Sequence, residues 1–419
     1  MSERNGRRVA IVAGCRTPFC KSGTALKGAR AVDLARYVAR ELLERTNLEG
    51  TDVDEVVFGQ VVPSALVPNV AREVSLLPQF PKEIPAYSLN RACASAGQAV
   101  SNAHDQIALG HANVVIAGGV ESLSDLPILA SRRLADILVE ASRARTVPAR
   151  LKTFSRVRPR DLVPVSPAIA EPSTGETMGQ SAEKMAKENR IARAAQDEWA
   201  LRSHQRAAQG TDDGRLTAEI VPWLPARPGE PVVTQDNGIR RDTSLEQMAK
   251  LKPVFDRRYG SVTAANSSPL TDGASAVLLT SDAAARALGY TPLAYVRSYA
   301  VAAVDPGWQL LQAPIFAVPK ALERAGIGWR DLGLVEVHEA FAAQVLSNLQ
   351  GWRALGWEID PEIINVMGGS IAIGHPFGAT GARIVTTLAN EMARRDAQFG
   401  LLSICAQGGM GFAMVLERR

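Results

Sequence analysis

The 419-residue chain has few cysteine, histidine and aromatic residues: four cysteines, five histidines and 5% Phe, Trp and Tyr. Four cysteines in so long a chain do not make a disulfide framework, and because none belongs to a CxxC pair, they do not suggest a zinc site. No apolar run approaches the roughly 18 residues that span a bilayer, and the apolar stretch after the N-terminal arginines is too short for a secretory signal. We therefore expect a cytoplasmic globular protein without a transmembrane segment.

The formal net charge is only +4, but the positive excess is concentrated in one segment. The basic residues of that segment are Arg132, Arg133, Arg143, Arg145, Arg150, Lys152, Arg156, Arg158 and Arg160. Such a patch attracts an anion, docks a partner or forms a solvated face. Because it lacks the interleaved aromatic residues of a stacking surface and any known reader motif, we do not expect nucleic-acid binding.

Apolar strands and amphipathic helices alternate in two parts of the chain. The first part shows strands at residues 9–14, 56–62, 86–89 and 114–117, and helices at 31–46, 70–77 and 94–109. The second shows strands at 261–265, 274–280, 292–301, 334–337, 363–366, 400–405 and 411–416, and helices at 315–325, 339–355 and 379–392. The pattern predicts an α/β fold with a parallel sheet covered on both faces, and the repeated order predicts two similar halves.

The segment between these parts reads as an insertion. From about residue 124 it contains basic helical segments and proline-containing loops, followed by two expected helices at 178–189 and 194–209.

Two residues in equivalent connections of the halves are candidates for catalysis. Cys93 lies in NRACASAGQ directly before an expected helix, where free N–H groups and the helix dipole favour a thiolate. His375 lies in GHP, in the corresponding connection of the second half. On its own, Cys93 would more often be a buried apolar residue and His375 a structural one. Packing of the halves about a pseudo-twofold axis would bring the two loops together.

Two further reactive residues end expected strands. His338 closes LVEVH, and Cys405 enters the glycine-rich turn CAQGGMG, whose backbone amides are suited to an anion nest. A hydrolase needs one nucleophile and one base. A second thiol is suited to moving a proton at carbon, as the making or breaking of a carbon–carbon bond beside a thioester requires. The four residues predict thioester chemistry in one pocket.

These motifs resemble those of the thiolase family, the acyl-CoA:acetyl-CoA C-acyltransferases, from RTPF at 16–19 to the last strand. The motifs are the Cys93 segment, VTAANSSPLTDGASA (262–276), HEAFAAQ (338–344), GGSIAIGHPFGATG (368–381) and CAQGGMG (405–411). The segment KTFSRVRPRDLVPV (152–165) and the histidine of HEAF are similar to the thiolase subunit of trifunctional fatty-acid β-oxidation complexes. The last motif commonly has glycine where this chain has Gln407, which keeps the backbone donor but changes that wall of the site.

The resemblance implies a fold of two βαβαβαββ halves packed as a five-layer αβαβα sandwich. Residues 1–123 and 257–281 would form the N-terminal half, 282–419 the C-terminal half, and 124–256 an inserted loop domain that covers CoA. The basic segment of this insertion would hold the CoA phosphates over the site.

The resemblance also implies a ping-pong cleavage of 3-ketoacyl-CoA. Cys93 would attack the keto carbon after His375 takes its proton, and Cys405 would protonate the departing enolate and then activate CoA. His338 and His375 would stabilise the enolate oxygen, and the backbone N–H groups of Cys93 and Gln407 would hold the tetrahedral oxyanion. The residues implied to line the pantetheine tunnel are Met178, Phe255, Ser268, Ala340 and Phe341.

The implied ligands are acyl-CoA and CoA as co-substrate, with no permanently bound cofactor and no metal. The implied assembly is a homodimer or tetramer. A hydratase/dehydrogenase α subunit and peripheral contact with a membrane are further candidate interactions.

Three alternatives remain open. A biosynthetic acetoacetyl-CoA thiolase would use the same residues in the condensing direction. A decarboxylating ketoacyl synthase-like enzyme shares a Cys-His-His site, although Cys405 and the GHP motif argue against it. A noncatalytic CoA or lipid carrier would not need all four reactive residues.

Overall fold

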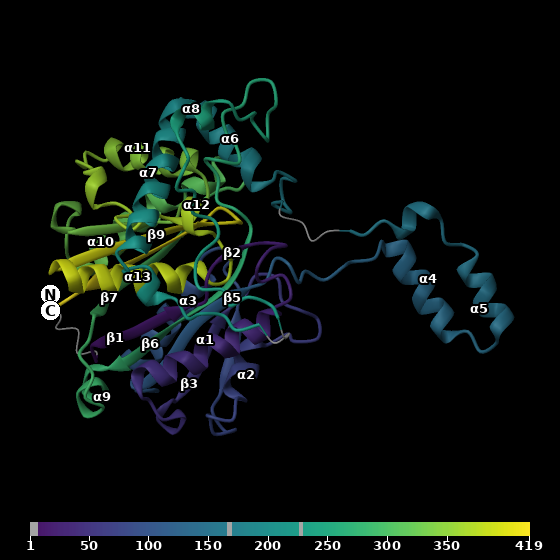
Figure 1. Cartoon of the computed structure of the whole chain (residues 1–419), viewed down its shortest axis with the longest axis horizontal. Coiled ribbons are helices and arrows are strands. Elements are labelled where there is room, and N and C mark those ends of the chain that lie inside the picture. The colour runs from purple at the N-terminus through teal and green to yellow at the C-terminus, as the bar shows by residue number, and fades with distance from the viewer. Residues whose placement is uncertain (1–6, 166–169, 226–228) are drawn as a thin grey trace.

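Strands and helices follow each other in two series separated by a long excursion, in a computed structural model that describes residues 7–165, 170–225 and 229–419 (Figure 1). The strands are β1 (Val9–Arg16), β2 (Cys20–Lys21), β3 (Glu55–Gly59), β4 (Ala86–Leu89), β5 (Val114–Glu121), β6 (Thr271–Ser281), β7 (Ala294–Ala303), β8 (Leu334–Val337), β9 (Phe399–Ala406) and β10 (Met410–Glu417). The helices are α1 (Ala31–Thr46), α2 (Val70–Ser75), α3 (Ser95–Ala108), α4 (Arg132–Arg143), α5 (Val147–Phe154), α6 (Met178–Glu188), α7 (Arg193–Asp212), α8 (Leu245–Ala249), α9 (Asp282–Ala287), α10 (Pro314–Ala325), α11 (Ala342–Ala354), α12 (Ser370–Ile373) and α13 (Thr380–Arg395).

The strand order is nearly mirror-symmetric about the centre of the sheet. It runs β4-β3-β5-β6-β1 in the first half and β7-β10-β9-β8 in the second, with β2 beside β6. The halves join where β1 pairs with β7 through Ala10 with Tyr295 and Ile11 with Ala294. The prediction of a parallel sheet is wrong for its centre, because β3 with β4, β3 with β5, and β8 with β9 are the parallel strand pairs.

Successive strand residues point into different layers, as the alternation of side chains along a strand requires. Ala10 belongs to an apolar cluster with α1 and α2, whereas Ile11 belongs to a cluster with α3 and α13. In the same way, Leu401 belongs to a cluster with α10 and α11, whereas its neighbour Leu402 belongs to the cluster with α3 and α13. Helices α3 and α13 therefore lie between the two halves of the sheet, which gives the predicted five-layer αβαβα sandwich.

The two central helices approach closely at a pair of glycines. A Cβ atom on Gly381 of α13 would lie 2.3 Å from the backbone nitrogen of Gly97 of α3, a contact that no side chain tolerates. Cys93 lies just before α3 and His375 just before α13. The glycine pair thus lets the two reactive loops converge.

Three expected strands differ from the structure. Residues 261–265 form no strand, because the N–H groups of Ser261 and Val262 donate to the buried Glu183 carboxylate. Residues 363–366 contribute one bridge, Val335 with Ile364, before Asn365 adopts a left-handed φ of 48°. Strand β3 ends at Gly59, and the residues after it turn toward Glu121.

The excursion between β5 and β6 has two parts. Helices α6 and α7 pack against α11, and α7 also packs against α12, on the body of the chain. Helices α4 and α5 instead form a hairpin that projects away from the body (Figure 1). In the described part of the chain, no helix combines the length and apolar character needed to cross a membrane.

Candidate active site

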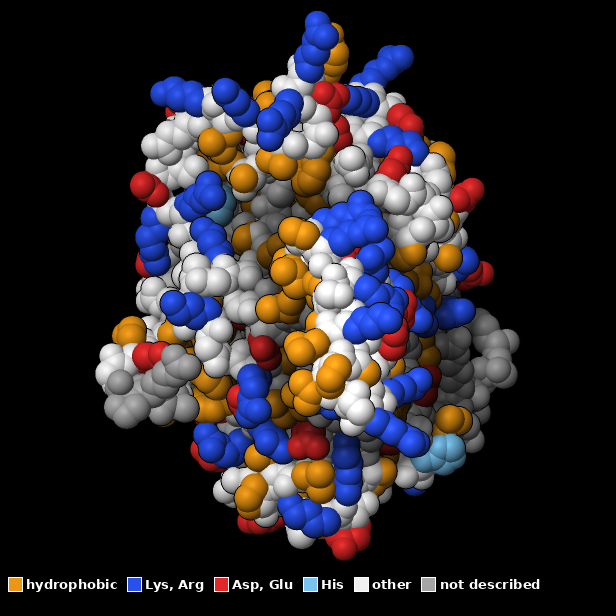
Figure 2. Space-filling model, turned by 90° about the vertical axis from the view of Figure 1, so that its right-hand side faces the viewer, with side chains coloured by type: hydrophobic (Ala, Val, Ile, Leu, Met, Phe, Trp, Pro, Cys, Tyr) orange, Lys and Arg blue, Asp and Glu red, His pale blue; other side chains and the backbone are white. Residues whose placement is uncertain are grey.

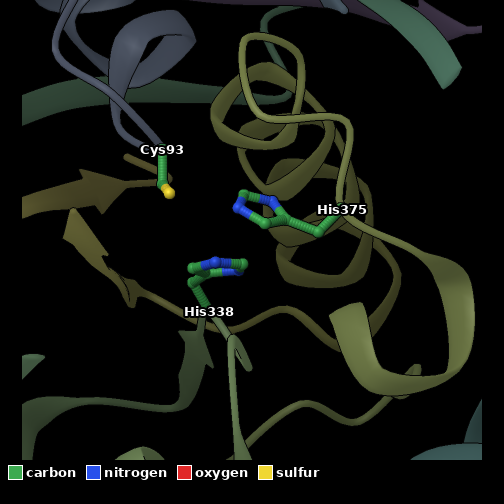
Figure 3. Close-up of side chains that lie close together, drawn as sticks. All are labelled: Cys93, His338 and His375. Atoms are coloured by element: carbon green, nitrogen blue, oxygen red, sulfur yellow. The ribbon is translucent and has the colours of Figure 1, made fainter. Parts of the chain in front are cut away.

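The loop between β4 and α3 holds Cys93 in a tight turn. Ala92 adopts a left-handed φ of 45°. The Ser95 hydroxyl accepts a hydrogen bond from the Arg91 N–H (2.8 Å) and donates to the Ala92 carbonyl (2.7 Å). These bonds fix the turn and present the Cys93 side chain next to the two histidines (Figure 3).

His338 and His375 face each other beside Cys93. Their ring centroids lie 4.1 Å apart, at an interplanar angle of 46°. One ring nitrogen of each and the Cys93 sulfur all lie within 4.8 Å of one another. The Nδ1 of His338 lies 2.9 Å from the Ser370 hydroxyl, and that of His375 lies 2.6 Å from the Thr380 hydroxyl. Both Nε2 atoms are buried without a protein hydrogen-bond partner, which leaves them for a substrate.

Burial keeps both imidazoles neutral. It lowers the pKa of His375 to about 3, and the nearby Arg383 guanidinium adds to the effect. The pKa of His338 is also well below its usual value, because of burial first and then the neighbouring His375 and Arg383. Each neutral ring carries a single proton, so one nitrogen of each donates and the other accepts.

In the free protein, burial outweighs the groups that favour a Cys93 thiolate. Burial raises the pKa of the Cys93 thiol to about 12, although the backbone N–H groups of Gln407 and of Cys93 itself act in the opposite direction. Cys93 is therefore a thiol that needs a base to react. The same two N–H groups act on the sulfur at which a substrate carbonyl would react.

Cys405 lies at the end of β9 and is 1% exposed. Burial and the nearby Cys93 raise its pKa well above the ordinary value of a thiol. It belongs to one apolar cluster with four of the five residues expected to line the pantetheine tunnel, Met178, Phe255, Ala340 and Phe341. The fifth, Ser268, donates its backbone N–H to the Ala340 carbonyl (2.9 Å), so the structure brings all five together.

The turn after Cys405 is anchored by the inserted segment. Gln407 donates its side-chain amide to the Ala170 carbonyl (2.9 Å), and the Gly408 N–H donates to the Glu171 carboxylate (2.9 Å). Gly408 and Gly409 both adopt left-handed φ values, 86° and 69°. The wall of the site at Gln407 is thus tied to the loop 170–171, an interaction that glycine at this position would lack.

Sequence reasoning missed a carboxylate that joins the loop after β3 to the loop that carries His375. Glu121 at the end of β5 is fully buried and accepts hydrogen bonds from the N–H groups of Val61, Val62 and Gly378. Burial raises its pKa to about 7, despite these three bonds. Its position after the paired glycines at the end of a strand was the available signal. Ser370, Thr380 and Arg383 were also missed, although two of them lie inside the glycine-rich motif around His375.

Cys93, His338 and His375 are the only His, Cys, Asp or Glu cluster with metal-ligand spacing among the described residues. A structural zinc site usually has four ligands, and no fourth joins these three in that part of the chain. The expectation of a metal-free site stays a prediction. The basic hairpin was expected to lie over the site to hold CoA phosphates, but within one chain it projects away from the body (Figure 1).

Comparisons with known proteins agree over nearly the whole chain. Residues 9–283 match the family model described as "Thiolase, N-terminal domain", and residues 290–418 match "Thiolase, C-terminal domain". The chain is 50% identical to the 3-ketoacyl-CoA thiolase of Yersinia enterocolitica, over 99% of this chain and 98% of that protein. It is 49% identical to the protein of the same name from Erwinia tasmaniensis, over 99% and 97%.

Solved structures show the same fold. The acetyl-CoA acetyltransferase of Bacillus anthracis superposes with a TM-score of 0.88 at 35% identity, covering 98% of this chain and 99% of that one. The human mitochondrial 3-ketoacyl-CoA thiolase superposes with a TM-score of 0.85 at 33% identity, covering 98% of both chains.

Proposed function

The chain belongs to the thiolase family, and from this premise we propose that it is a 3-ketoacyl-CoA thiolase of fatty-acid β-oxidation. It would cleave a 3-ketoacyl-CoA with CoA into acetyl-CoA and an acyl-CoA shortened by two carbons. The relatives that match at about half identity over their full length carry this name. The observation that carries the proposal is a nucleophilic thiol beside two neutral imidazoles, with a second buried thiol close by.

The first half-reaction forms an acyl-enzyme. His375 takes the proton of the Cys93 thiol as the sulfur attacks the keto carbon, and the backbone N–H groups of Cys93 and Gln407 stabilise the tetrahedral oxyanion. The carbon–carbon bond then breaks. The leaving enolate is stabilised by His338 and His375 and receives a proton from Cys405, which gives acetyl-CoA.

The second half-reaction releases the product. The Cys405 thiolate takes the proton of the incoming CoA thiol, and the CoA sulfur attacks the acyl-enzyme carbonyl. Cys93 leaves and regains its proton from the His375 imidazolium, so both thiols and both histidines return to their starting states. The raised pKa of Cys405 supports this role, because a weakly acidic thiol gives a thiolate basic enough to deprotonate CoA.

The predicted tunnel residues support an approach for pantetheine. Phe255 and Phe341 pack edge to face, with ring centroids 6.1 Å apart, and belong to one apolar cluster with Met178 and Cys405. We place the thiol end of CoA there. CoA is a co-substrate in this scheme, and no permanently bound cofactor is required. The binding of its phosphates by the basic residues of segment 132–160 stays a prediction.

The hairpin α4–α5 offers a surface for the expected partners. It exposes apolar side chains, among them Leu138, Val139, Val147 and Leu151. On the face that Figure 2 turns to the viewer, hydrophobic side chains lie among Lys and Arg side chains. We propose a cytoplasmic homodimer or tetramer in which this surface meets a hydratase/dehydrogenase α subunit or an anionic membrane surface.

A condensing, acetoacetyl-CoA-forming thiolase is the second candidate, favoured by the structural likeness to the Bacillus anthracis acetyl-CoA acetyltransferase. Rates of thiolysis with 3-ketoacyl-CoA of 4 to about 16 carbons separate the two. Activity that extends to long chains supports the β-oxidation enzyme, and activity confined to four carbons supports the alternative.

A second experiment tests whether Cys93 is the nucleophile. Wild type mixed with acyl-CoA should gain one acyl mass by intact-protein mass spectrometry, and Cys93→Ala should gain none. Cys20→Ala, which replaces another buried cysteine, is the matched control and should acylate normally. An adduct that persists on Cys93→Ala would refute the assignment.

A further inference from the structure

The two active-site imidazoles rest on different hydroxyl groups. Each has a buried Nε2 without a hydrogen-bond partner, and the Nδ1 of each lies against the hydroxyl of a serine or threonine. One nitrogen of each ring lies within 4.8 Å of the Cys93 sulfur (Figure 3). Because both rings are neutral, the proton on each ring occupies either Nδ1 or Nε2. The hydroxyl on Nδ1 therefore decides whether Nε2 donates or accepts in the active site.

Ser370 faces both His338 and a buried arginine. The Arg383 Nη2 donates to the Ser370 oxygen (3.1 Å), and guanidinium groups are donors only. Arg383 is 1% exposed, and its charge lies 3.7 Å from the Glu336 carboxylate. The Ser370 oxygen thus accepts from Arg383. The one hydrogen of its hydroxyl then has the His338 Nδ1, 2.9 Å away, as its acceptor. His338 consequently carries its own proton on Nε2, which becomes a donor.

Thr380 has the opposite relation to His375. Its hydroxyl donates to the Pro376 carbonyl one turn earlier (3.0 Å), a common bond for threonine in a first helical turn. With its hydrogen so placed, the Thr380 oxygen accepts, and the His375 Nδ1 at 2.6 Å is the donor. The His375 Nε2 then holds a lone pair, next to a thiol that must lose its proton.

We propose that Ser370, held by Arg383, and Thr380 are positioning residues that fix His338 and His375 in opposite tautomers. His338 is set as a hydrogen-bond donor through Nε2, and His375 is set as a base through Nε2. The arrangement gives two chemically identical side chains different starting states. His375 first accepts the proton of the thiol, whereas His338 is a hydrogen-bond donor from the start. The catalytic roles in this inference rest on the proposed thiolase function, whereas the two tautomers do not depend on it.

The tautomers are measurable without any reaction. The chain has five histidines, so selective ¹⁵N-histidine labelling gives few signals, and His338→Gln and His375→Gln variants assign two of them. We expect His338 to show protonated Nε2 and His375 to show protonated Nδ1. The same tautomer on both rings, or the reverse assignment, would overturn the proposal while leaving the thiolase function intact.

Variants separate the two hydroxyls by function. Thr380→Val removes the acceptor for the Nδ1–H of His375 and should slow alkylation of Cys93 by iodoacetamide about tenfold. Thr380→Ser keeps the hydroxyl and should restore the rate. Ser370→Ala should leave alkylation within about twofold of wild type but slow exchange of the C2 protons of acetyl-CoA in D₂O about tenfold.

The two defects must be distinct. If Ser370→Ala and Thr380→Val lower both rates equally, or if Thr380→Ser fails to rescue, the hydroxyls have a merely structural role and the proposal is wrong. Circular dichroism and thermal unfolding of each variant establish that the fold is kept, so that a loss of rate can be attributed to the active site.

Discussion

The backbone N–H of Gly378 donates a hydrogen bond to the Glu121 carboxylate at 3.1 Å, across the boundary between the two halves of the molecule. The same carboxylate accepts from Val61 and Val62 of the loop after β3. Gly378 lies three residues after His375, so one buried side chain ties the end of β5 to the loop that carries the proposed base. We infer that Glu121 fixes the position of the loop that carries His375.

Replacing Glu121 by glutamine should therefore impair catalysis as well as stability. Three N–H donors surround the carboxylate, and a glutamine amide would place its own NH₂ against at least one of them. We expect kcat to fall about tenfold and the free energy of unfolding to fall by about 1–3 kcal/mol. Steady-state thiolysis and urea unfolding measure the two effects.

Glu55→Gln is the matched control, because Glu55 begins β3 at the end remote from this loop and is only half-buried. It should leave both quantities nearly unchanged. A normal kcat for Glu121→Gln would show that the contact with Gly378 does not position His375.

The sequence predicted those features that depend on a short segment of the chain. The four reactive residues could be predicted because His338 and Cys405 lie at the ends of strands and Cys93 and His375 lie in loops that precede helices. Helix α1 and strand β4 were predicted to the residue. The pairing of β5, β6, β1, β7, β10 and β9 as antiparallel neighbours could not, since strand direction depends on connections that cross the whole chain. The segment 261–265 is apolar like a strand, but the Glu183 carboxylate takes its N–H groups.

The residues that surround the reactive groups could not be predicted, because their places depend on contacts between segments that are distant in the sequence. Arg383 lies on the buried side of helix α13, where a helical pattern would predict an apolar residue, and its partner Glu336 lies on strand β8. The position of the hairpin α4–α5 could not be predicted from the sequence either. Its exposed apolar side chains have helical spacing, but nothing in the sequence indicates which surface they would cover.

Removing the proposed base should make alkylation of Cys93 depend on solvent hydroxide. The pKa of this thiol is raised to about 12, so at neutral pH almost none of it is ionised unless His375 accepts the proton. In His375→Asn, labelling by iodoacetamide at pH 7 should be about 100-fold slower and should increase with pH up to the pKa of the thiol. Intact-mass time courses measure it, with Cys93→Ala as the blank. A rate equal to wild type would remove His375 from the role of base.

The second thiol should be separable from the first. Cys405→Ala should still be acylated on Cys93 by a saturated acyl-CoA, more slowly than wild type, because CoA can leave as a thiolate without the proton that Cys405 would give it. It should not exchange the C2 protons of acetyl-CoA in D₂O, since the residue that moves protons at carbon is missing. Mass spectrometry of protein and recovered acetyl-CoA gives both answers from one sample. Exchange at the wild-type rate would assign this step to another group.

Buried neutral histidines should make the fold sensitive to mild acid. Burial lowers the pKa of His204 to about 4, and the nearby Arg240 and Lys21 add to the effect. The pKa values of His338 and His375 are also lowered. The unfolded chain binds a proton on each of these histidines below about pH 6.5, whereas the folded chain does not. The free energy of unfolding therefore falls with decreasing pH by about 1.4 kcal/mol per unit and per histidine, and for His204 the loss ends near pH 4.

His204→Gln isolates one of these contributions. His204 accepts a hydrogen bond from the Arg240 N–H at its Nδ1 (3.2 Å), and the oxygen of a glutamine amide can accept the same bond. Between pH 6.5 and 5, urea unfolding of the variant should lose less stability than wild type, by about 1.4 kcal/mol per unit. His111→Gln, at an exposed position, should keep the wild-type dependence. Equal slopes for His204→Gln and wild type would mean that His204 is protonated in the folded chain, against the burial that the packing of α7 imposes on it.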